Sequence, residues 1–413
     1  MTIFVSIAAY RDPELGPTIQ DCIAKARYPS DLRIVVCWQH DEQEQLGSVS
    51  HLRHVEFLEF DWRDSNGPCW ARAEIMKRWR GEEYYLQLDS HHRFVRHWDA
   101  KLAEQFALAP SPKPLLTTYC QDYDSDTGVP FSTAPTTIGF DSFTPDGIPL
   151  YRSASESMDH RAGISPPIRA RFVSAHFLFA AGSFVQEVEY DPALYFHGEE
   201  ITLAVRAYSC GYDLFHPSEA IVFHRYSRDG RAKHWDDHSD GAPVERPWYE
   251  RDRSSRDRVT ELLRNRPIGR FAFGNCRTVN DYENYAGIDF RARLIQDYVL
   301  TGGEPPSPAG SNWVRGTRSC QVTIHLERAQ LAKVAIICAT EWHVTLFDDE
   351  EAPVHSTVLP RNLVDGILTD TSPLILIQFT IEARATPYSW TLTVGGVGSW
   401  DVLRGRVEAI LDS

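Results

Sequence analysis

Two residues at the end of one apolar run combine side chains that bind divalent cations. The run Leu86-Gln87-Leu88 ends at Asp89, and His91 follows two positions later. Residues two apart on extended backbone project to the same side, and a carboxylate oxygen with an imidazole nitrogen suits an ion such as Mn²⁺ or Mg²⁺. The same residues also fit a plain turn, in which Asp89 accepts backbone hydrogen bonds and His91 is solvated. This segment alone leaves both interpretations open.

The chemistry that needs such a pair is the departure of a nucleoside diphosphate from a sugar. Breaking the bond between sugar and diphosphate concentrates negative charge on phosphate oxygens, where a divalent cation acts as a Lewis acid and clamp. A cation that also touches phosphate oxygens needs only two or three protein ligands, because substrate and water supply the rest.

A second segment adds candidates in the order Gly-Glu-Glu, helix, Gly, strand, His. Glu199 and Glu200 stand at the start of a predicted helix, and His224 ends a predicted strand. We predict that the two carboxylates are catalytic, because they could hold sugar hydroxyls or the acceptor, or stabilise positive charge on a sugar ring. His224 would return a third ligand to the metal. Acidic residues also favour helix N-termini on charge grounds alone, and a strand-end histidine can be satisfied by ordinary hydrogen bonds.

The bulk composition excludes some partners. The chain has 413 residues, which predicts two domains, and a formal net charge of −15, which argues against nucleic acid as a partner. No apolar run approaches the roughly 20 residues that span a bilayer. The N-terminal apolar run stops at Arg11 and Asp12, as a first strand would, and the eight scattered cysteines include no C-x-x-C pair. We therefore expect a cytoplasmic protein with reduced cysteines and no membrane span.

The elements that must position the candidate residues alternate between strand and helix. Apolar runs predict strands over 3–8, 33–38, 55–60, 84–88 and 115–119, and helical spacing predicts helices over 17–26, 71–79, 98–108, 203–210 and 290–300. This alternation indicates a mostly parallel sheet covered by helices, in which ligands bind beyond the carboxyl ends of the strands. Asp89 stands at such an end. In the polar stretch 225–266, we interpret His234 to His238 as a solvated loop or mobile lid rather than a second metal cluster.

The periodicity changes to two after residue 312. Residues 301–312 are rich in Gly, Pro and Ser and are predicted to be a linker. Beyond it, apolar residues alternate with polar ones in six to eight short segments, which suggests a β-sandwich. We therefore predict an α/β catalytic domain over 1–300 and a smaller all-β, sandwich-like accessory domain over 313–413.

These residues, in this order, resemble a GT-A glycosyltransferase. The D-S-H segment, the G-E-E segment with its helix and the late histidine are similar to the polypeptide N-acetylgalactosaminyltransferases. The match is closer to the N-acetylglucosaminyltransferases that modify hydroxyproline on the protein Skp1. The stretches that carry it are 4–13, 67–72, 88–94, 198–200, 223–226 and 277–290.

The resemblance covers about residues 3 to 292 and implies a Rossmann-like GT-A domain, a metal and a nucleotide sugar. It favours UDP-GlcNAc as donor, Mn²⁺ as cofactor, retention of anomeric configuration, and a hydroxyl acceptor on a peptide or glycan. It carries metal-binding roles to Asp89, His91 and His224. The predicted donor contacts are Ala8, Ala9, Tyr10, Arg11, Arg72, Asp89, Ser90 and Arg225.

The alternative is a glycosidase or carbohydrate-binding protein that uses the same acidic cleft. Asp89, Glu199 and Glu200 could supply the acid and nucleophile of a retaining hydrolase. That interpretation leaves His91 and His224 without a role, and activity that persists in a chelator would favour it. The sequence does not choose between GlcNAc, GalNAc and glucose, and it does not identify the acceptor or the role of the C-terminal domain.

Overall fold

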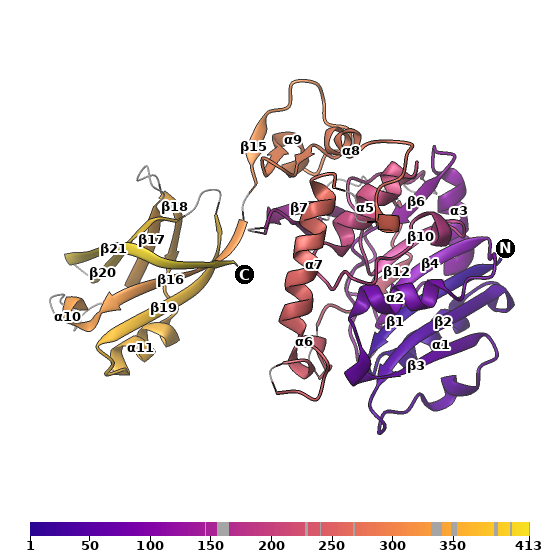
Figure 1. Cartoon of the computed structure of the whole chain (residues 1–413), viewed down its shortest axis with the longest axis horizontal. Helices are drawn as coiled ribbons and strands as arrows, with labels where there is room; N and C mark the ends of the chain where they lie inside the picture. The colour runs from indigo at the N-terminus through magenta and orange to yellow at the C-terminus, as the bar shows by residue number, and fades with distance from the viewer. Residues whose placement is uncertain are drawn as a thin grey trace. The chain divides into compact units, whose positions relative to one another are not determined.

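A computed structural model of the chain divides into two compact units (Figure 1). It describes residues 1–144, 146–154, 165–227, 230–239, 241–266, 269–316, 318–331, 341–347, 353–383, 387–396 and 399–412. The first unit comprises Met1–Phe140 and Tyr151–Val314, and the second comprises Asp141–Leu150 and Arg315–Ser413. A short segment from the earlier part of the chain therefore belongs to the second unit.

An eight-stranded mixed sheet forms the centre of the first unit, in the order β3-β2-β1-β4-β10-β6-β11-β9. Its parallel half, β3-β2-β1-β4, is the part that the strand–helix alternation predicts, and the antiparallel β10 joins it to the parallel pair β6 and β11. The strands are β1 Ile3–Tyr10, β2 Leu32–His40, β3 Val55–Asp61, β4 Tyr84–Asp89, β6 Pro114–Thr117, β9 Ile168–Arg169, β10 Phe177–Ala181 and β11 Asp213–His216.

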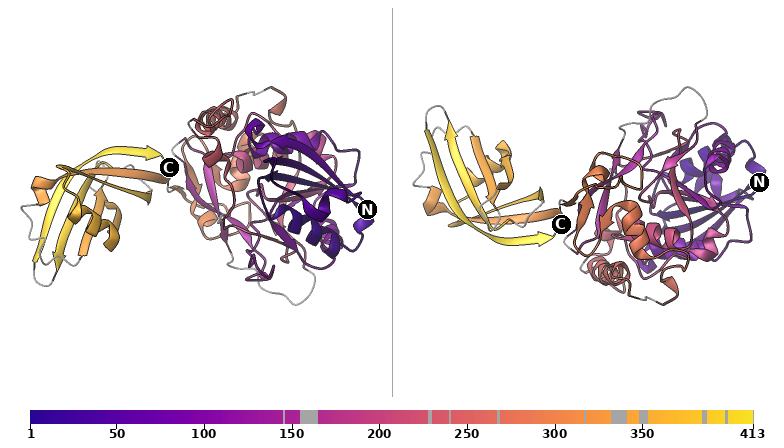
Figure 2. Two further views of the ribbon diagram at one scale, coloured as in Figure 1. Left: turned by 90° about the horizontal axis from the view of Figure 1, so that it is seen from below. Right: turned by 90° about the horizontal axis from the view of Figure 1, so that it is seen from above.

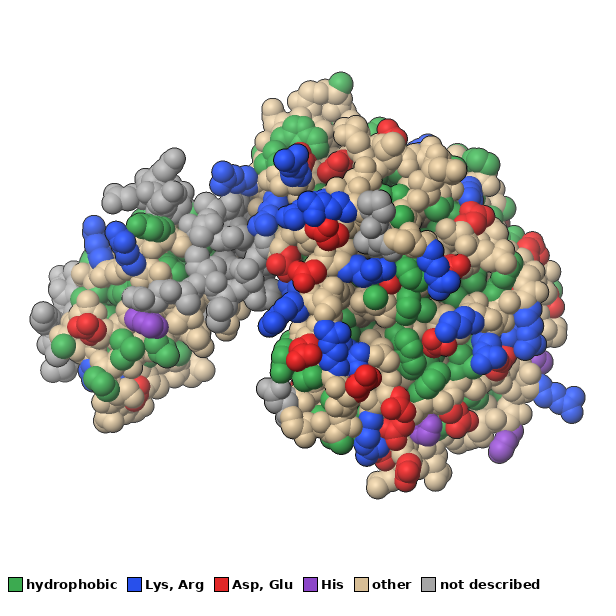
Figure 3. Space-filling model, viewed as in Figure 1, with side chains coloured by type: hydrophobic (Ala, Val, Ile, Leu, Met, Phe, Trp, Pro, Cys, Tyr) green, Lys and Arg blue, Asp and Glu red, His purple; other side chains and the backbone are tan. Residues whose placement is uncertain are grey.

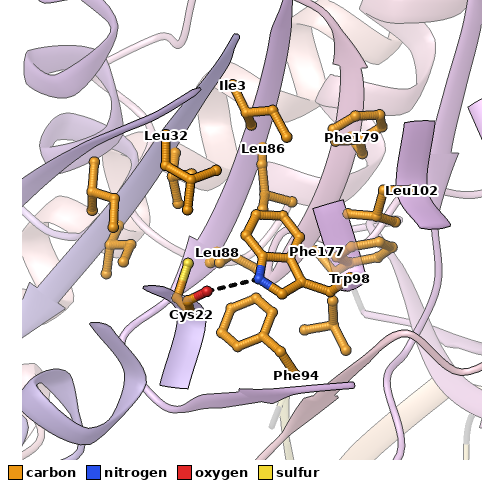
Figure 4. Close-up of a cluster of buried hydrophobic side chains, with 14 of the residues drawn as sticks. Ile3, Cys22, Leu32, Leu86, Leu88, Phe94, Trp98, Leu102, Phe177 and Phe179 are labelled. Carbon is orange, nitrogen blue, oxygen red and sulfur yellow. Dashed lines mark hydrogen bonds between the residues drawn. The ribbon is translucent and has the colours of Figure 1, made fainter. Parts of the chain in front are cut away.

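Helices pack on both faces of this sheet (Figure 2). Alternate apolar residues of the strands, such as Val5 and Leu86, form a buried cluster with α1 and α3, where the Trp98 indole N–H donates to the Cys22 carbonyl at 2.8 Å (Figure 4). This packing fixes the strand ends that carry the site. The helices are α1 Leu15–Lys25, α2 Pro68–Met76, α3 Trp98–Leu108, α4 Phe184–Glu187, α5 Glu199–Ser209, α6 His234–Asp237, α7 Trp248–Leu263, α8 Val279–Ala286 and α9 Asp297–Leu300.

The predicted helix over 290–300 is wrong for most of its length. The chain instead forms the hairpin β13 Ile288–Asp289 and β14 Leu294–Gln296, and only α9 is helical. Arg293 has φ of 54°, in the left-handed region, which interrupts a right-handed helix.

The start of α5 depends on a glycine that lies against α7. Gly198 has φ of 89°, and a Cβ atom there would lie 2.5 Å from Val259 Cγ2. We expect Gly198→Ala to lower the free energy of unfolding by about 2–4 kcal/mol, because backbone strain and overpacking add. Gly81→Ala is the matched control, since Gly81 has φ of 98° but no neighbour within 4 Å. Urea unfolding that gives equal losses for both variants would contradict this contact.

The second unit is built mainly from antiparallel strands, drawn in orange and yellow in Figure 2. The first half of β21 pairs with β20 and its second half with β16, so β21 links two groups of strands around one apolar core. Helix α11 also contributes Val364 and Ile367 to this core, which strand periodicity does not reveal. The elements are β16 Arg318–Glu327, α10 Arg328–Leu331, β17 Glu341–Phe347, β18 Pro353–Val358, α11 Arg361–Thr369, β19 Leu374–Ala383, β20 Ser389–Gly396 and β21 Ser399–Asp412.

The surface mixes charges of both signs. On the face of the first unit drawn in Figure 3, Lys and Arg side chains are interspersed with Asp and Glu. No helix in the described part of the chain is long and apolar enough to cross a bilayer.

Candidate active site

The turn after β4 is held in place by helix α1. Thr18 Oγ1 donates to the carbonyls of Ser90 and His92 at 2.9 and 3.2 Å, and the His92 N–H donates back to Thr18 Oγ1 at 2.9 Å. Thr18 is fully buried. The side chains of Asp89 and His91 therefore project from a rigid turn at the carboxyl end of a central strand.

A small two-stranded sheet brings His224 to the same place. Strand β12 Val222–His224 pairs antiparallel with β5 His92–Phe94, which sets His224 opposite His92. The next residue, Arg225, donates its backbone N–H to the His91 carbonyl at 3.1 Å. These contacts join segments that are more than a hundred residues apart in sequence.

Asp89, His91 and His224 offer a set of metal-binding atoms. One candidate ligand atom from each lies within 4.8 Å of the others. His91 Nε2 and His224 Nε2 lie 3.8 and 3.5 Å from Asp89 Oδ2. His224 is 7% exposed, and neither of its ring nitrogens has a hydrogen-bond partner among the described residues. Buried polar atoms normally have partners, and one carboxylate with two imidazoles is a donor set that fits Mn²⁺.

Asp12 determines which nitrogen of His91 faces the carboxylate of Asp89. His91 Nδ1 lies 2.7 Å from Asp12 Oδ2. Although burial opposes it, hydrogen bonds from His91 and Ser90 lower the pKa of Asp12 to about 2. Asp12 is therefore an ionised acceptor, so His91 donates its Nδ1–H to it and turns Nε2 toward Asp89.

Two further histidines, which the sequence interpretation did not single out as ligands, pack beside this group. His176 stacks on His224 with ring centroids 4.1 Å apart, and His92 Nδ1 lies 3.1 Å from the Asp89 carbonyl. Burial lowers the pKa of His176 to about 3 and lowers the pKa values of His92 and His224 well below the ordinary histidine value. These rings are therefore neutral, which is the form that can bind a metal.

Arg72 lies between two of the predicted carboxylates. It is 2% exposed, and its guanidinium contacts Asp89 Oδ1 at 2.5 Å and Glu199 Oε1 on its other branch. Although burial opposes it, the positive charge of Arg72 lowers the pKa of Asp89 well below its ordinary value. Glu199, 4% exposed, thus holds Arg72, and Arg72 leaves Oδ2 of Asp89 to face the two histidines.

Glu200 points to a different set of partners. Its carboxylate accepts from Tyr119 Oη at 2.6 Å and from the Ala175 N–H at 2.9 Å. Tyr119 in turn packs against His176, with ring centroids 5.3 Å apart. Glu200 is therefore tied to the histidine group through one intervening ring.

The titration of Glu200 gives a testable pH dependence. Burial raises the pKa of Glu200 from 4.5 to about 7. Between these values the folded chain keeps a proton that the unfolded chain releases, so stability falls as pH rises through this window. We expect Glu200→Gln to remove this fall. In urea unfolding, the free energy of unfolding of the variant minus that of wild type should rise by on the order of 3 kcal/mol as pH increases from 4.5 to 8. A constant difference across this range would contradict it.

A cavity of about 210 Å³ opens beside the three candidate ligands. Arg225, Arg231 and Lys233 place three cationic side chains in its wall, and Tyr10, Tyr195, Phe196, Tyr226 and Trp235 place aromatic ones. Three positive charges next to a divalent-cation site suit a ligand with a diphosphate group.

The predicted donor contacts divide into two groups. Five of them line this cavity: Ala8, Tyr10, Asp89, Ser90 and Arg225. Ala9 is buried in the sheet, Arg72 is held by the two carboxylates, and Arg11 bonds Glu44 and Asp237, each at 3.0 Å. The cavity lining does not include the side chains of these three residues, nor those of Glu199 and Glu200.

The interpretation of His234 to His238 as a solvated loop needs correction. His234 and His238 are buried, their rings stack with centroids 3.8 Å apart, and His234 Nδ1 lies 2.8 Å from Tyr195 Oη. Tyr10 Oη donates to Asp237 at 2.9 Å. Helix α6 is thus packed against the turn after β1 and forms part of the cavity wall.

A Rossmann-like sheet with an Asp-x-His turn at the end of a central strand defines a GT-A glycosyltransferase fold. The family model described as Glycosyltransferase (GlcNAc) matches residues 2–54 and 47–292, and the chain belongs to this family. No curated protein is similar enough in sequence to match the chain.

Several solved structures are distantly similar. S. aureus TarS 1-349 is 16% identical over 55% of this chain and 60% of its own length, with a TM-score of 0.36, so the chain spans less than two thirds of that structure. The same TarS fragment in complex with UDP-GlcNAc is 15% identical over 65% of this chain and 77% of its own, with a TM-score of 0.37. GalNAc-T7 with UDP, GalNAc and Mn²⁺ is 12% identical over 98% of this chain and 72% of its own, with a TM-score of 0.46.

Proposed function

We propose that this protein is a metal-dependent, retaining glycosyltransferase that transfers GlcNAc from UDP-GlcNAc to a hydroxyl group of a peptide or glycan. The observation that carries the proposal is the group Asp89, His91 and His224 beside a cavity with three cationic side chains. Membership of the Glycosyltransferase (GlcNAc) family supports transfer as the reaction and GlcNAc as the sugar.

Each part of the site has a chemical task in this reaction. A divalent cation held by Asp89, His91 and His224 would supply Lewis-acid stabilisation of the departing diphosphate. Arg225 and Lys233 offset the remaining phosphate charge and orient the nucleotide. Arg72 orients Asp89 through Oδ1.

The carboxylates of the cavity wall support retention without a protein nucleophile. Among the described residues that line the cavity, the two carboxylates are Asp12 and Asp89. Asp12 accepts from His91 and Ser90, and Asp89 is paired with Arg72. Neither is free to attack the sugar or to act as the base of an inverting enzyme. The acceptor hydroxyl then approaches from the side on which the diphosphate leaves, and its proton passes to the departing phosphate oxygen.

The same contacts weaken the glycosidase alternative. A hydrolase needs one free carboxylic acid and one free carboxylate on either side of the glycosidic bond. Arg72 bridges Asp89 and Glu199, and Glu200 is held by Tyr119 and Ala175.

The stereochemistry of donor hydrolysis tests the proposal. The protein would be incubated with Mn²⁺ and UDP-GlcNAc, UDP-GalNAc or UDP-glucose in turn, and the released sugar followed by proton NMR before it mutarotates. We expect UDP-GlcNAc to be consumed fastest and the α-anomer of GlcNAc to appear first. Initial release of the β-anomer, or a covalent glycosyl–protein adduct in the mass spectrum, would contradict retention by this route.

A further inference from the structure

Asp12 is the point at which four separate groups meet near the candidate ligands. Its Oδ2 accepts from Ser90 Oγ and His91 Nδ1, each at 2.7 Å, and its Oδ1 accepts from the Glu14 N–H at 2.9 Å. Arg231 Nη1 lies 3.4 Å from Oδ2. The Asp12 side chain is 5% exposed. All four partners are donors, so the site is built for a buried anion.

The position of Asp12 follows from the sheet. Strands β1 and β4 are adjacent and parallel, with Ala8 paired to Asp89, so the turn after β1 lies beside the turn after β4. Asp12 belongs to the first turn, and Ser90 and His91 belong to the second. The carboxylate therefore ties together the two strand ends that border the cavity.

The contact with His91 has a chemical consequence for the metal. A histidine that binds a metal through one nitrogen commonly donates its other N–H to a carboxylate, which fixes the tautomer and strengthens the ligand. An asparagine in place of Asp12 could turn its amide N–H₂ toward Nδ1, which would move the proton to Nε2 and block that nitrogen as a ligand. The function of this contact is therefore specific to a carboxylate.

We infer that Asp12 is a positioning residue, which holds His91 with Nε2 free for a divalent cation and has its own buried charge compensated by Arg231. The inference rests on the proposed metal-dependent function and names a residue that this function does not itself require. It assigns a role to the aspartate of the turn after β1 that is separate from contact with the nucleotide.

The test measures Mn²⁺ affinity directly, by the electron paramagnetic resonance signal of free Mn²⁺ during titration in the presence of UDP. We expect Asp12→Asn to weaken Mn²⁺ binding about 10- to 100-fold, the range seen when such partners of metal ligands are changed. Asp12→Asn added to His91→Ala should cause no further loss beyond about threefold, because Asp12 acts through His91.

The matched control is Asp99→Asn. Asp99 is also a buried carboxylate, and it accepts from the backbone N–H groups of Arg27 and Tyr28 at 2.7 and 2.8 Å, away from the candidate ligands. We expect it to lower thermal stability but to leave Mn²⁺ affinity unchanged. This separates a general loss of packing from a loss of ligand positioning.

Three outcomes would overturn the inference, and they are distinguishable. Wild-type protein that binds no Mn²⁺ would overturn the proposed function and the role of Asp12 together. If wild-type protein binds Mn²⁺ and Asp12→Asn binds it equally tightly, the role of Asp12 alone is overturned. A full, additive loss from Asp12→Asn in the His91→Ala background would show that Asp12 acts on a group other than His91.

Discussion

Replacing Asp89 with asparagine is expected to lower the rate of metal-dependent UDP release from UDP-GlcNAc at least about a thousandfold. Asp89 is the carboxylate of the three candidate ligands, and its removal takes away the anion that the cation needs. A cation at a departing diphosphate contributes several kcal/mol of transition-state stabilisation, and each 1.36 kcal/mol is about tenfold in rate. The substitution nearly preserves volume, so the fold should persist, and a coupled assay for UDP measures the rate.

Asp61→Asn is the matched control for this prediction. Asp61 also ends a parallel strand of the same sheet, but it bonds Arg63 and does not line the cavity. The rate of UDP release by the Asp61→Asn protein should stay within about threefold of wild type, as for surface changes away from a site. An Asp89→Asn protein that retains a tenth or more of the wild-type rate would show that the reaction does not use this carboxylate.

Replacing Arg72 with methionine is expected to lower the free energy of unfolding by about 3–5 kcal/mol, because it leaves buried carboxylates without their cation. Arg72 is 2% exposed and contacts both Asp89 and Glu199. Burial already raises the pKa of Glu199, against the opposing charge of Arg72, so the loss of the guanidinium makes the ionised form costlier still. Urea unfolding followed by tryptophan fluorescence measures the change.

Arg33→Met provides a comparison with the same number of ion pairs. Arg33 contacts Glu56 and Glu82 at 2.8 and 2.9 Å, but its side chain is 20% exposed. Partly exposed pairs are worth about 0–1 kcal/mol each, so Arg33→Met should cost clearly less than Arg72→Met. Equal losses would mean that the burial of Arg72 does not set the strength of its contacts.

The parallel half of the sheet and the Asp89 turn could be predicted because their patterns are local. Strands β1, β2 and β4 consist mostly of apolar residues that are buried, and a polar residue after such a strand stands at the ligand-binding edge. His224 could be predicted only from its place at the end of the order Gly-Glu-Glu, helix, Gly, strand, His. What brings it to His91 is a pair of three-residue strands, which are too short to give a recognisable period.

Other features could not be predicted because they depend on contacts between distant segments. The pairing of Asp12 with His91 and the packing of His176 on His224 join residues 79 and 48 positions apart. Helix α7, 16 residues long, gives little amphipathic signal because its buried side begins with Asp252 and Ser255, and its buried apolar residues lie only near its end. The sequence predicts a catalytic role for Glu199, since nothing local to it reveals that Arg72 contacts its carboxylate.

The central claim is best tested by UDP release from UDP-GlcNAc during a cycle of metal removal and return. The purified protein would be assayed as prepared, after EDTA, and after dialysis into Mn²⁺, with no acceptor needed because water can accept the sugar. The account predicts release with Mn²⁺, its loss in EDTA, and its recovery when Mn²⁺ is restored. Release that continues undiminished in EDTA would contradict a catalytic metal at Asp89, His91 and His224.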